Sequence, residues 1–586
     1  MNSTSIKLER LYGLKGDVKD NIHYIDESTV IYPCGYNLVV YNLDKKTQRF
    51  IPLASSANSS GSGDITCMAV SSARNANRSR VVAVAERGGP NGRPSITIYD
   101  LATQKMRGKM PLESPLVASK KYVSMCFSPD GKYLLAQGGA PDWTLINWQW
   151  ERPKAIQVAM VSDKIGAAIY QCSYCPSDPT VVCVSGNGIL RFLHLDQTTF
   201  KVIQFNMGKR EAQNYLCHCW IDDKILVGTD TGDIFVFENA EFKGILATSP
   251  GGGKSIDALV PYSNHPSGFV AGCEEGLLYV FEKDEKEMFR QASYSQIESN
   301  AVRIKNIAIS PSEDNVICAL ENNQAFILGI QNTEILHTEK SNFEPLVLPC
   351  HHLQITGMDV CMRKPLVVTC GLDRSIRVWN YHSHTVDVIR YFTEAPLSVA
   401  FHPSGLHIIA GFYDSLRLMN LLMGEIRSYK DFTIKGCREV RFSNGGQYFA
   451  AANAALIQVY ATFTCDLIAS IPHKGKVTSL HWNADDTHII SSAMEGGVYT
   501  WSLADGKLQP SSKRLGKCNY SSVVGGADGK IYLVGNDRKL KVIDPVSNES
   551  TQIDADVILT QVILDCSYNY IYIYILVLFW DYLFNP

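Results

Sequence analysis

The feature that most constrains this chain is a short phrase that recurs along most of its length. The clearest copy is GLDRSIRVWN at residues 371–380, and further copies lie at 229–238, 411–420 and 535–544. Each copy places a turn containing Gly, Asp or Asn before alternating apolar residues, which predicts a tight turn leading into a half-buried strand. Self-similarity at a fixed spacing predicts a fold built from one repeated unit of short strands.

A second phrase alternates with the first. FSPDGKYLLA at residues 127–136 and FHPSGLHIIAG at 401–411 set a turn with Pro, Asp, Ser or Gly and continue into an apolar strand. Alternating phrases, recurring about every 40–45 residues, are typical of a WD40-type β-propeller with one four-stranded blade per repeat. The pattern predicts an all-β binding platform rather than a catalyst.

The middle of each first-phrase strand marks one unit, and the spacing of roughly 40 to 58 residues leaves room for four strands in every unit. The twelve markers are Val40, Ile98, Asn147, Arg191, Phe235, Tyr279, Phe326, Val378, Leu418, Gln458, Tyr499 and Lys541.

The markers divide the chain into two predicted rings. Since a closed ring of this repeat holds about seven blades, the markers from Val40 to Phe326 predict a complete seven-bladed propeller over residues 1–345. The five from Val378 to Lys541 predict a second, truncated propeller over residues 346–560. An arc of about five blades would leave strand edges unprotected, so we expect the chain to be incomplete. Residues 6–14 are the expected closing strand of the first ring.

Composition narrows the function classes. Lys and Arg total 55 against 58 Asp and Glu, for a net charge of −3, which argues against a surface for nucleic acid or anionic membrane. Many of the 17 Cys alternate with Val, Ala and Leu, so we expect most of the cysteines to be buried and to pack as small apolar residues. The N-terminus lacks the apolar stretch of a secretory signal, which favours a reduced cytosolic compartment.

Residues 561–586 differ from the rest of the chain because Tyr, Ile, Leu and Phe dominate them. The apolar run at 571–580 is shorter than the about 20 residues that span a bilayer, and it has no basic flanks. We interpret this anomalous tail as a translated intron or a gene-model error. The alternative is a native C-terminus, with the tail as a strand or a membrane-dipping segment.

Three motifs resemble parts of ligand-binding sites. GGGKS at residues 251–255 resembles part of a phosphate loop, but Thr248 stands where the full motif needs Gly, and the segment 256–260 has a strand pattern instead of a helical one. Cys172 and Cys175 form a C-x-x-C, and residues 217–219 form a C-H-C, yet neither has the second pair of ligands that a structural zinc site needs. We predict that the GGGKS segment is an inter-blade loop and that the residues of the two cysteine motifs are buried in strands. We predict no metal, no cofactor and no catalytic residue.

Acidic residues in the turns have a predicted structural role. In this repeat an Asp in the turn before the last strand commonly accepts hydrogen bonds within its own blade, often from a His near the start of the unit. We therefore expect Asp373 to pair with His352, the second histidine of the Cys350–His352 run. Asp414, Asp230 and Asp537 are expected to act similarly. No Ser-His-Asp or paired-carboxylate arrangement stands out.

Several segments go beyond the general repeat. Residues 11–42, 214–238, 363–381 and 442–453, and LRLMNLL followed by RSYK within 402–430, resemble the cilia- and flagella-associated protein 57 family of motile cilia. The resemblance extends from Leu11 to about Asp556. Members of this family have tandem propellers followed by a long coiled coil, so the resemblance implies that the last two blades and the coiled coil are missing here.

The resemblance implies a non-enzymatic scaffold in the cytoskeleton of the cilium or flagellum axoneme. Such a scaffold supports assembly or docking of inner dynein arms near the dynein regulatory complex, and so ciliary motility. The implied partners are components of these two assemblies, with doublet microtubules as a further candidate, and no nucleic acid, membrane or small-molecule substrate. The alternatives are a cytosolic tandem-propeller scaffold of actin dynamics or intraflagellar transport and, third, a propeller enzyme.

Overall fold

The computed structural model describes residues 10–574 except 54–63, 72–79, 89–92, 112–117, 163–166, 197–198, 206–210, 248–252, 264–266, 285–287, 298–301, 330–342, 348–349, 352, 474, 510–511, 515–517, 527–528, 536, 538, 545–549, 555–560 and 566–569. These residues form β-strands and one 3-10 turn, Glu274–Gly276, with no α-helix among them. None of the described segments forms a helix with the length and hydropathy that crossing a bilayer requires.

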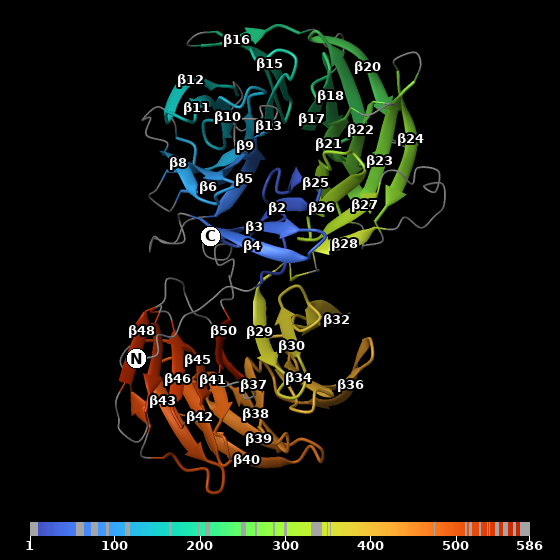
Figure 1. Ribbon diagram of the computed structural model, residues 1–586. Coiled ribbons are helices and arrows are strands. Elements are labelled where there is room, and N and C mark those ends of the chain that lie inside the picture. The colour runs from blue at the N-terminus through green and yellow to red at the C-terminus, as the bar shows by residue number, and fades with distance from the viewer. Residues whose placement is uncertain are drawn as a thin grey trace. The chain divides into compact units, whose positions relative to one another are not determined.

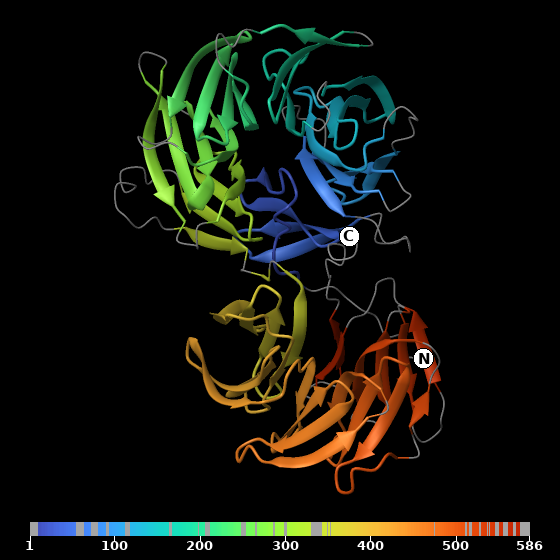
Figure 2. The same cartoon turned by 180° about the vertical axis from the view of Figure 1, so that it is seen from behind.

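The chain separates into two compact units, the first at Leu8–Cys350 and the second at His351–Pro586. In the described part of the first unit, seven antiparallel four-stranded sheets follow one another round a ring (Figures 1 and 2). Their strands are β1 (His23–Asp26), β2 (Thr29–Cys34), β3 (Asn37–Asn42), β4 (Thr47–Pro52); β5 (Ile65–Val70), β6 (Val81–Glu86), β7 (Ser95–Asp100), β8 (Met106–Pro111); β9 (Tyr122–Phe127), β10 (Tyr133–Gly138), β11 (Thr144–Gln149), β12 (Lys154–Met160); β13 (Ile169–Tyr174), β14 (Val181–Gly186), β15 (Ile189–Leu195), β16 (Phe200–Ile203); β17 (Tyr215–Ile221), β18 (Lys224–Thr229), β19 (Asp233–Glu238), β20 (Glu241–Ala247); β21 (Ile256–Tyr262), β22 (Gly268–Cys273), β23 (Leu277–Lys283), β24 (Phe289–Gln296); and β25 (Ile304–Ile309), β26 (Asn315–Leu320), β27 (Ala325–Gly329), β28 (Glu344–Val347).

The second unit repeats the same sheet, coloured yellow to red in Figure 1. Its described strands are β29 (Ile355–Val360), β30 (Leu366–Gly371), β31 (Ser375–Asn380), β32 (Thr385–Tyr391); β33 (Ser398–Phe401), β34 (His407–Gly411), β35 (Leu416–Leu422), β36 (Glu425–Phe432); β37 (Glu439–Phe442), β38 (Tyr448–Asn453), β39 (Leu456–Ala461), β40 (Leu467–Pro472); β41 (Val477–Trp482), β42 (His488–Ala493), β43 (Gly497–Ser502), β44 (Lys513–Arg514); and β45 (Tyr520–Gly525), β46 (Ile531–Gly535), β47 (Lys539–Ile543), β48 (Ser550–Asp554). The all-β prediction is confirmed, while the domain boundaries at residues 345 and 560 stay predictions.

The position of a strand within its sheet explains its composition. The second strands β6, β22 and β30 are buried along their whole length, because a neighbouring sheet covers each face. Such strands have continuous runs of small and branched apolar residues. Cys370 lies in β30, and Cys318 lies in β26, a second strand whose last five residues are buried. Burial raises the pKa of both thiols to about 12. These cysteines are therefore inert core residues, as expected.

The join between the first and last sheets of the first unit differs from the prediction. All four strands of the last sheet, β25 to β28, come from residues 304–347, and residues 10–14 form no strand. The predicted closing strand at 6–14 is therefore wrong in its described part; residues 6–9 lie outside the described residues. Side chains make the join instead: the Asn306 amide donates to Asn21 Oδ1 (2.9 Å) and Val18 O (3.2 Å).

The tail contributes two described strands. β49 (Gln561–Asp565) pairs with β50 (Tyr570–Tyr574) in a two-stranded antiparallel sheet. β49 lies against both β45 and β29, the first strands of two other sheets in the second unit. Residues 575–586 lie outside the described residues. The interpretation of 561–586 as non-coding sequence stays a prediction.

Candidate functional site

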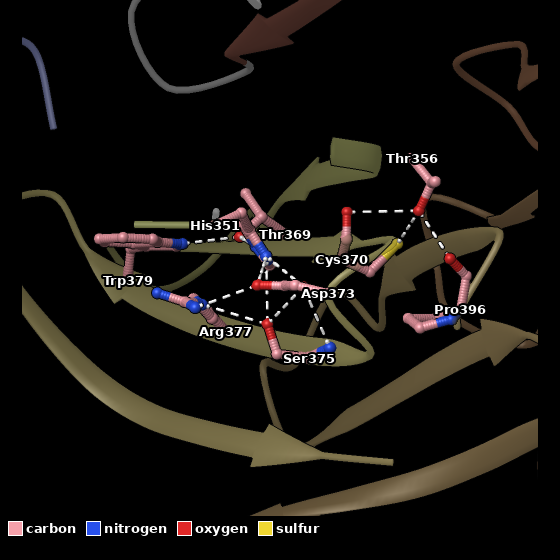
Figure 3. Close-up of polar contacts among 9 residues, drawn as sticks. All are labelled: His351, Thr356, Thr369, Cys370, Asp373, Ser375, Arg377, Trp379 and Pro396. Atoms are coloured by element: carbon pink, nitrogen blue, oxygen red, sulfur yellow. Dashed lines mark hydrogen bonds and ion pairs between the residues drawn. The ribbon is translucent and has the colours of Figure 1, made fainter. Parts of the chain in front are cut away.

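The most connected polar group of the second unit surrounds Asp373, in the turn between β30 and β31 (Figure 3). His351 Nδ1 lies 2.9 Å from Asp373 Oδ1. Ser375 Oγ donates to the same oxygen at 2.8 Å, and Arg377 Nη2 donates to Oδ2 at 3.1 Å. At most 2% of the His351, Asp373 and Arg377 side chains is exposed. The carboxylate therefore has several donors and almost no contact with solvent.

The network continues from His351 to the two middle strands of the sheet. His351 Nε2 lies 2.8 Å from Thr369 Oγ1, and Trp379 Nε1 donates to that hydroxyl at 2.8 Å. Since Nδ1 faces a carboxylate, it donates, and Nε2 accepts the hydroxyl proton of Thr369. The chain of bonds therefore joins β30 and β31 to the segment that precedes β29.

The electrostatics of Asp373 exclude a role as a general base. Burial opposes its charge, but hydrogen bonds from His351 and Ser375 and the charge on Arg377 outweigh burial and lower its pKa to about 2. A base that works near neutral pH needs a pKa near the operating pH and access to a substrate proton. Asp373 has neither property, so the network stabilises the fold.

The structure shows one histidine partner of Asp373 and explains why related acids differ. His351 binds Asp373, whereas His352 lies outside the described residues. The histidine precedes its acid by 22 residues, and the residue 22 positions before Asp414 is Phe392, whose ring packs on Phe412. Without a histidine partner, Asp414 is half exposed and bonds to Ser415 Oγ.

Among the described residues, the two remaining predicted acids also make no hydrogen bond to a histidine. Asp230 is exposed, and its backbone N–H donates to Asn214 O at 3.2 Å. Asp537 pairs with Lys541 Nζ at 2.6 Å. A buried acid–histidine pair is therefore present at Asp373, whereas Asp414 and Asp537 bond to Ser415 and Lys541 of their own sheets, and Asp230 is exposed.

A second network, not predicted from the sequence, occupies the sheet β41–β44. His473 Nε2 and Trp501 Nε1 both lie 2.9 Å from Ser491 Oγ. Glu495 stands 22 positions after His473, where the first network has Asp373, but it is exposed. The histidine and tryptophan at matching distances were the sequence signal that could have revealed this network.

The cysteine and histidine motifs that resemble ligand sites have hydrogen-bond partners within the sheets. His218, in the C-H-C motif, lies 2.7 Å from Ser173 Oγ and 2.8 Å from Ser185 Oγ, and its burial lowers its pKa to about 3. Cys217 Sγ donates to Ile256 O, and Cys172 Sγ to Ser124 O. Within the described part of the chain, no three His, Cys, Asp or Glu side chains are placed to hold a metal ion.

The GGGKS segment leads directly into a strand. Residues 251 and 252 lie outside the described residues, and Lys254 Nζ pairs with the carboxylate of Glu275. β21 begins at Ile256, so no helix N-terminus follows to bind a phosphate. The segment therefore connects two neighbouring sheets, as predicted.

A pair of carboxylates on the first strands of two sheets in the second unit, β29 and β37, was not predicted from the sequence. Arg441 Nη1 donates to Asp359 Oδ1 at 2.6 Å, and its Nε donates to Glu439 Oε1 at 3.3 Å. Burial raises the pKa of both acids, and the charge of Arg441 acts in the opposite direction. Asp359 also accepts the Phe401 N–H at 2.7 Å. The guanidinium occupies the space between the acids, so this cluster joins β29, β33 and β37.

Contacts between sheets make the arrangement rigid. Thr356 Oγ1 donates to Pro396 O at 2.6 Å, which ties β29 to the segment before β33 (Figure 3). Trp482 Nε1 donates to Arg441 O at 3.2 Å, which ties β41 to β37. Such scaffolds hold their surface turns at fixed positions, which suits the binding of other macromolecules.

Comparison with known proteins agrees with this description. The WD domain, G-beta repeat family matches residues 344–380 and 465–502. These two matches contain the network around Asp373 and the one around His473.

Similarity to longer proteins extends over most of the chain. It is 34% identical to mouse (Mus musculus) cilia- and flagella-associated protein 57 over 93% of this chain and 46% of the relative. Cilia- and flagella-associated protein 57 A of Tetrahymena thermophila is 33% identical over 66% of this chain and 31% of its own length. Human (Homo sapiens) echinoderm microtubule-associated protein-like 2 is 22% identical over 86% of this chain and 75% of its own.

None of these three names describes an enzyme. The chain spans less than half the length of the two cilia- and flagella-associated relatives. This chain is a WD-repeat protein homologous to cilia- and flagella-associated protein 57.

Proposed function

We propose that this protein is a non-enzymatic scaffold of the motile cilium axoneme that supports assembly or docking of inner dynein arms near the dynein regulatory complex. The observation that carries the proposal is the similarity to mouse cilia- and flagella-associated protein 57 along 93% of the chain. The proposed partners are components of these two assemblies, and the proposed location is the axoneme of the cilium or flagellum.

The internal chemistry of the chain supports a scaffold. Asp373 is ionised and bonded to three side chains, and Asp359 and Glu439 are joined through Arg441. Buried charges with this many partners fix the geometry of the sheets and offer no free proton acceptor. The turns between strands then provide surfaces for partners at fixed spacing.

The test is a null strain together with a strain that carries the endogenous protein with a fluorescent tag. We expect the tag along motile axonemes, and electron cryotomography of null axonemes to show loss of a subset of inner arms with outer arms retained. Re-expression of the full gene should restore the missing arms. A tag absent from axonemes, or null axonemes with every inner arm present, contradicts the proposal.

Similarity to a protein named as microtubule-associated favours a second candidate, direct binding to the microtubule lattice. Co-sedimentation of the purified chain with stabilised microtubules, with actin filaments as the comparison, tests it. Pelleting with microtubules alone supports a lattice-bound scaffold. Pelleting with actin alone favours the actin-dynamics alternative, and movement of the tag with transport trains favours intraflagellar transport.

A further inference from the structure

One end of three sheets in the second unit exposes an unusual amount of apolar surface. Met423 is fully exposed, and Phe463 and Leu406 are 67% and 51% exposed. Leu406 and Met423 lie in turns of the sheet β33–β36, and Phe463 lies in a turn of β37–β40. Met362 and Tyr381, 44% and 43% exposed, lie in the corresponding turns of β29–β32. All of these turns join the first strand of a sheet to the second, or the third to the fourth. We call the turns at 361–365, 381–384, 402–406, 422–424, 443–447 and 462–466 the turn face. Since successive strands of a sheet are antiparallel, these turns lie at the same end of each sheet.

Hydrogen bonds and ring contacts show that the turn face is continuous from sheet to sheet. Lys364 Nζ donates to Gly405 O at 3.3 Å, and His402 Nε2 lies 3.1 Å from Gly446 O. Leu421 N donates to Leu406 O at 2.8 Å within the middle sheet. The Phe463 ring lies 6.0 Å from the His402 ring. The exposed apolar groups therefore form one band across three neighbouring sheets.

The equivalent turns of the first unit have a different composition. Their described residues include Glu27, Asp130, Asp178, Asp222 and Glu313. Large exposed apolar side chains of that unit are mainly on outer strands, with Met106 and Met288 next to a third-to-fourth connection. Among the described turns at this position, those of the second unit therefore expose more large apolar side chains than those of the first. Solvent-exposed apolar patches of this kind mark binding surfaces.

The two ends of the turn face differ in the sign of their exposed charge. Arg363 and Lys364 are exposed at the β29–β32 end, and the turns of that sheet, 361–365 and 381–384, contain no acidic residue. At the opposite end, the turns of the next sheet, β41–β44, expose Asp485 and Asp505. A partner that covers the apolar band therefore meets positive charge at one end and negative charge at the other.

We propose that the turn face binds an amphipathic α-helix of a partner protein. The apolar stripe of the helix covers Leu406, Met423 and Phe463, its acidic end lies over Arg363 and Lys364, and its basic end points toward Asp485. Turns offer no row of free strand N–H and C=O groups, so an added strand has nothing to pair with, whereas a helix presents an apolar stripe to a side-chain surface. This inference concerns the surface itself and holds whichever cellular system supplies the helix.

The test uses the purified chain and two stapled, fluorescently labelled helical peptides of about 18 residues, roughly 27 Å long. Both peptides have one Leu stripe and equal net charge. One has Glu at its N-terminal end and Lys at its C-terminal end, and the other has the charged ends exchanged. A helix can bind in either direction along the band, so both of these peptides can place Glu over Arg363 and Lys364. A third peptide, in which every Glu is replaced by Lys, is therefore the discriminating probe. Fluorescence anisotropy measures the affinity.

We expect both mixed-charge peptides to bind at least about tenfold more tightly than the all-Lys peptide. R363E should reduce that preference severalfold. M423S combined with F463S should weaken binding of the mixed-charge peptides at least about tenfold. The matched control is Y413S combined with M494S, two exposed apolar residues in turns at the other end of the sheets, and it should leave the affinity unchanged. Hydrogen exchange should show peptide-dependent protection at 403–406 and 462–465.

Four outcomes overturn the proposal. The first is equal affinity for the mixed-charge and all-Lys peptides, and the second is an equal loss in the M423S/F463S and Y413S/M494S variants. The third is self-association of the chain that M423S/F463S abolishes, which would assign the face to a second copy. The fourth is binding to phosphatidylserine vesicles that the same variant abolishes, which would assign it to a lipid surface. Since all substituted residues are exposed, circular dichroism should show that each variant remains folded.

Discussion

The imidazole of His351 and the carboxylate of Asp373 are joined at 2.9 Å with both side chains fully excluded from solvent. The pair lies at the end of one sheet and connects the entry segment of the second unit to the turn between β30 and β31. It is therefore the place where a single neutralised charge should have the largest effect on that sheet.

Replacing the carboxylate should destabilise the second unit. In Asp373→Asn the buried guanidinium of Arg377 loses its counter-charge, and breaking such a pair costs about 3 kcal/mol or more. The urea midpoint of the transition that exposes Trp379 should fall accordingly. Asp414→Asn, in the corresponding turn of the next sheet, is the control, because its exposed carboxylate should contribute within about 0.5 kcal/mol. Equal shifts in the two variants would contradict the role assigned to the network.

The same pair predicts a pH dependence. The pKa of Asp373 is lowered from its ordinary value of 3.8 to about 2, so its stabilising effect is complete above pH 3.8 and disappears as the pH falls through about 2. The difference in urea midpoint between the wild type and Asp373→Asn should therefore be constant from pH 7 to about 5. It should shrink between about pH 4 and 2, as the wild type itself becomes protonated. A difference that grows in this range would show that the sign is wrong.

The join in the first unit can be tested at Asn306. Asn306→Ala removes the amide that serves Asn21 Oδ1 and Val18 O and the oxygen that accepts the Asp20 N–H. Leaving buried polar groups unpaired costs about 1–3 kcal/mol. Hydrogen exchange should accelerate at residues 15–24 and 304–309, with residues 215–229, across the ring, as the internal reference. Uniform acceleration over the whole unit would indicate global destabilisation instead of local opening.

Two phenylalanines of the second unit form a matched pair. Phe449 is fully buried and stacks on Tyr460 at 5.3 Å, whereas Phe463 is 67% exposed on the turn face. Phe449→Ala should cost about 3–5 kcal/mol because it leaves a cavity, and Phe463→Ala should change stability by less than about 0.5 kcal/mol. Thermal unfolding distinguishes the two variants. A large loss at Phe463 would mean that its side chain stabilises the fold, and it would weaken the assignment of the turn face to binding.

Much of the fold could be predicted because local patterns determine it. The turn-and-strand phrase located the third strand of nearly every sheet. The continuous apolar run that precedes each phrase forms the buried second strand. The structural role of Asp373 as a buried hydrogen-bond acceptor could be predicted from its turn. The histidine partner could not, because His351 and His352 are adjacent and the backbone direction before β29 decides which side chain reaches the carboxylate. Asp414 was assigned the same role because its turn looks alike. Phe392 stands 22 residues before Asp414, at the distance where Asp373 has His351. This difference explains why Asp414 has no comparable buried pair.

Other features arise only when distant segments meet. Asp359 and Arg441 are 82 residues apart in the sequence, and neither phrase marks them. The join at Asn306 also had no local signal, because its partners lie near the N-terminus. The turn face escaped prediction since Leu406, Met423 and Phe463 are single apolar residues in separate turns, and only the stacking of sheets brings them together.

The side-chain join of the first unit also sets a delay during synthesis. Asn21 precedes Asn306 by 285 residues, and a ribosome adding about 5–20 residues per second needs roughly 15–60 s to cover that distance. For this time β1 and its apolar neighbours have no seventh sheet to pack against. The newly made first unit is therefore an open arc that exposes a sheet face at each end, and such exposed apolar surface favours aggregation until residues 304–347 leave the ribosome.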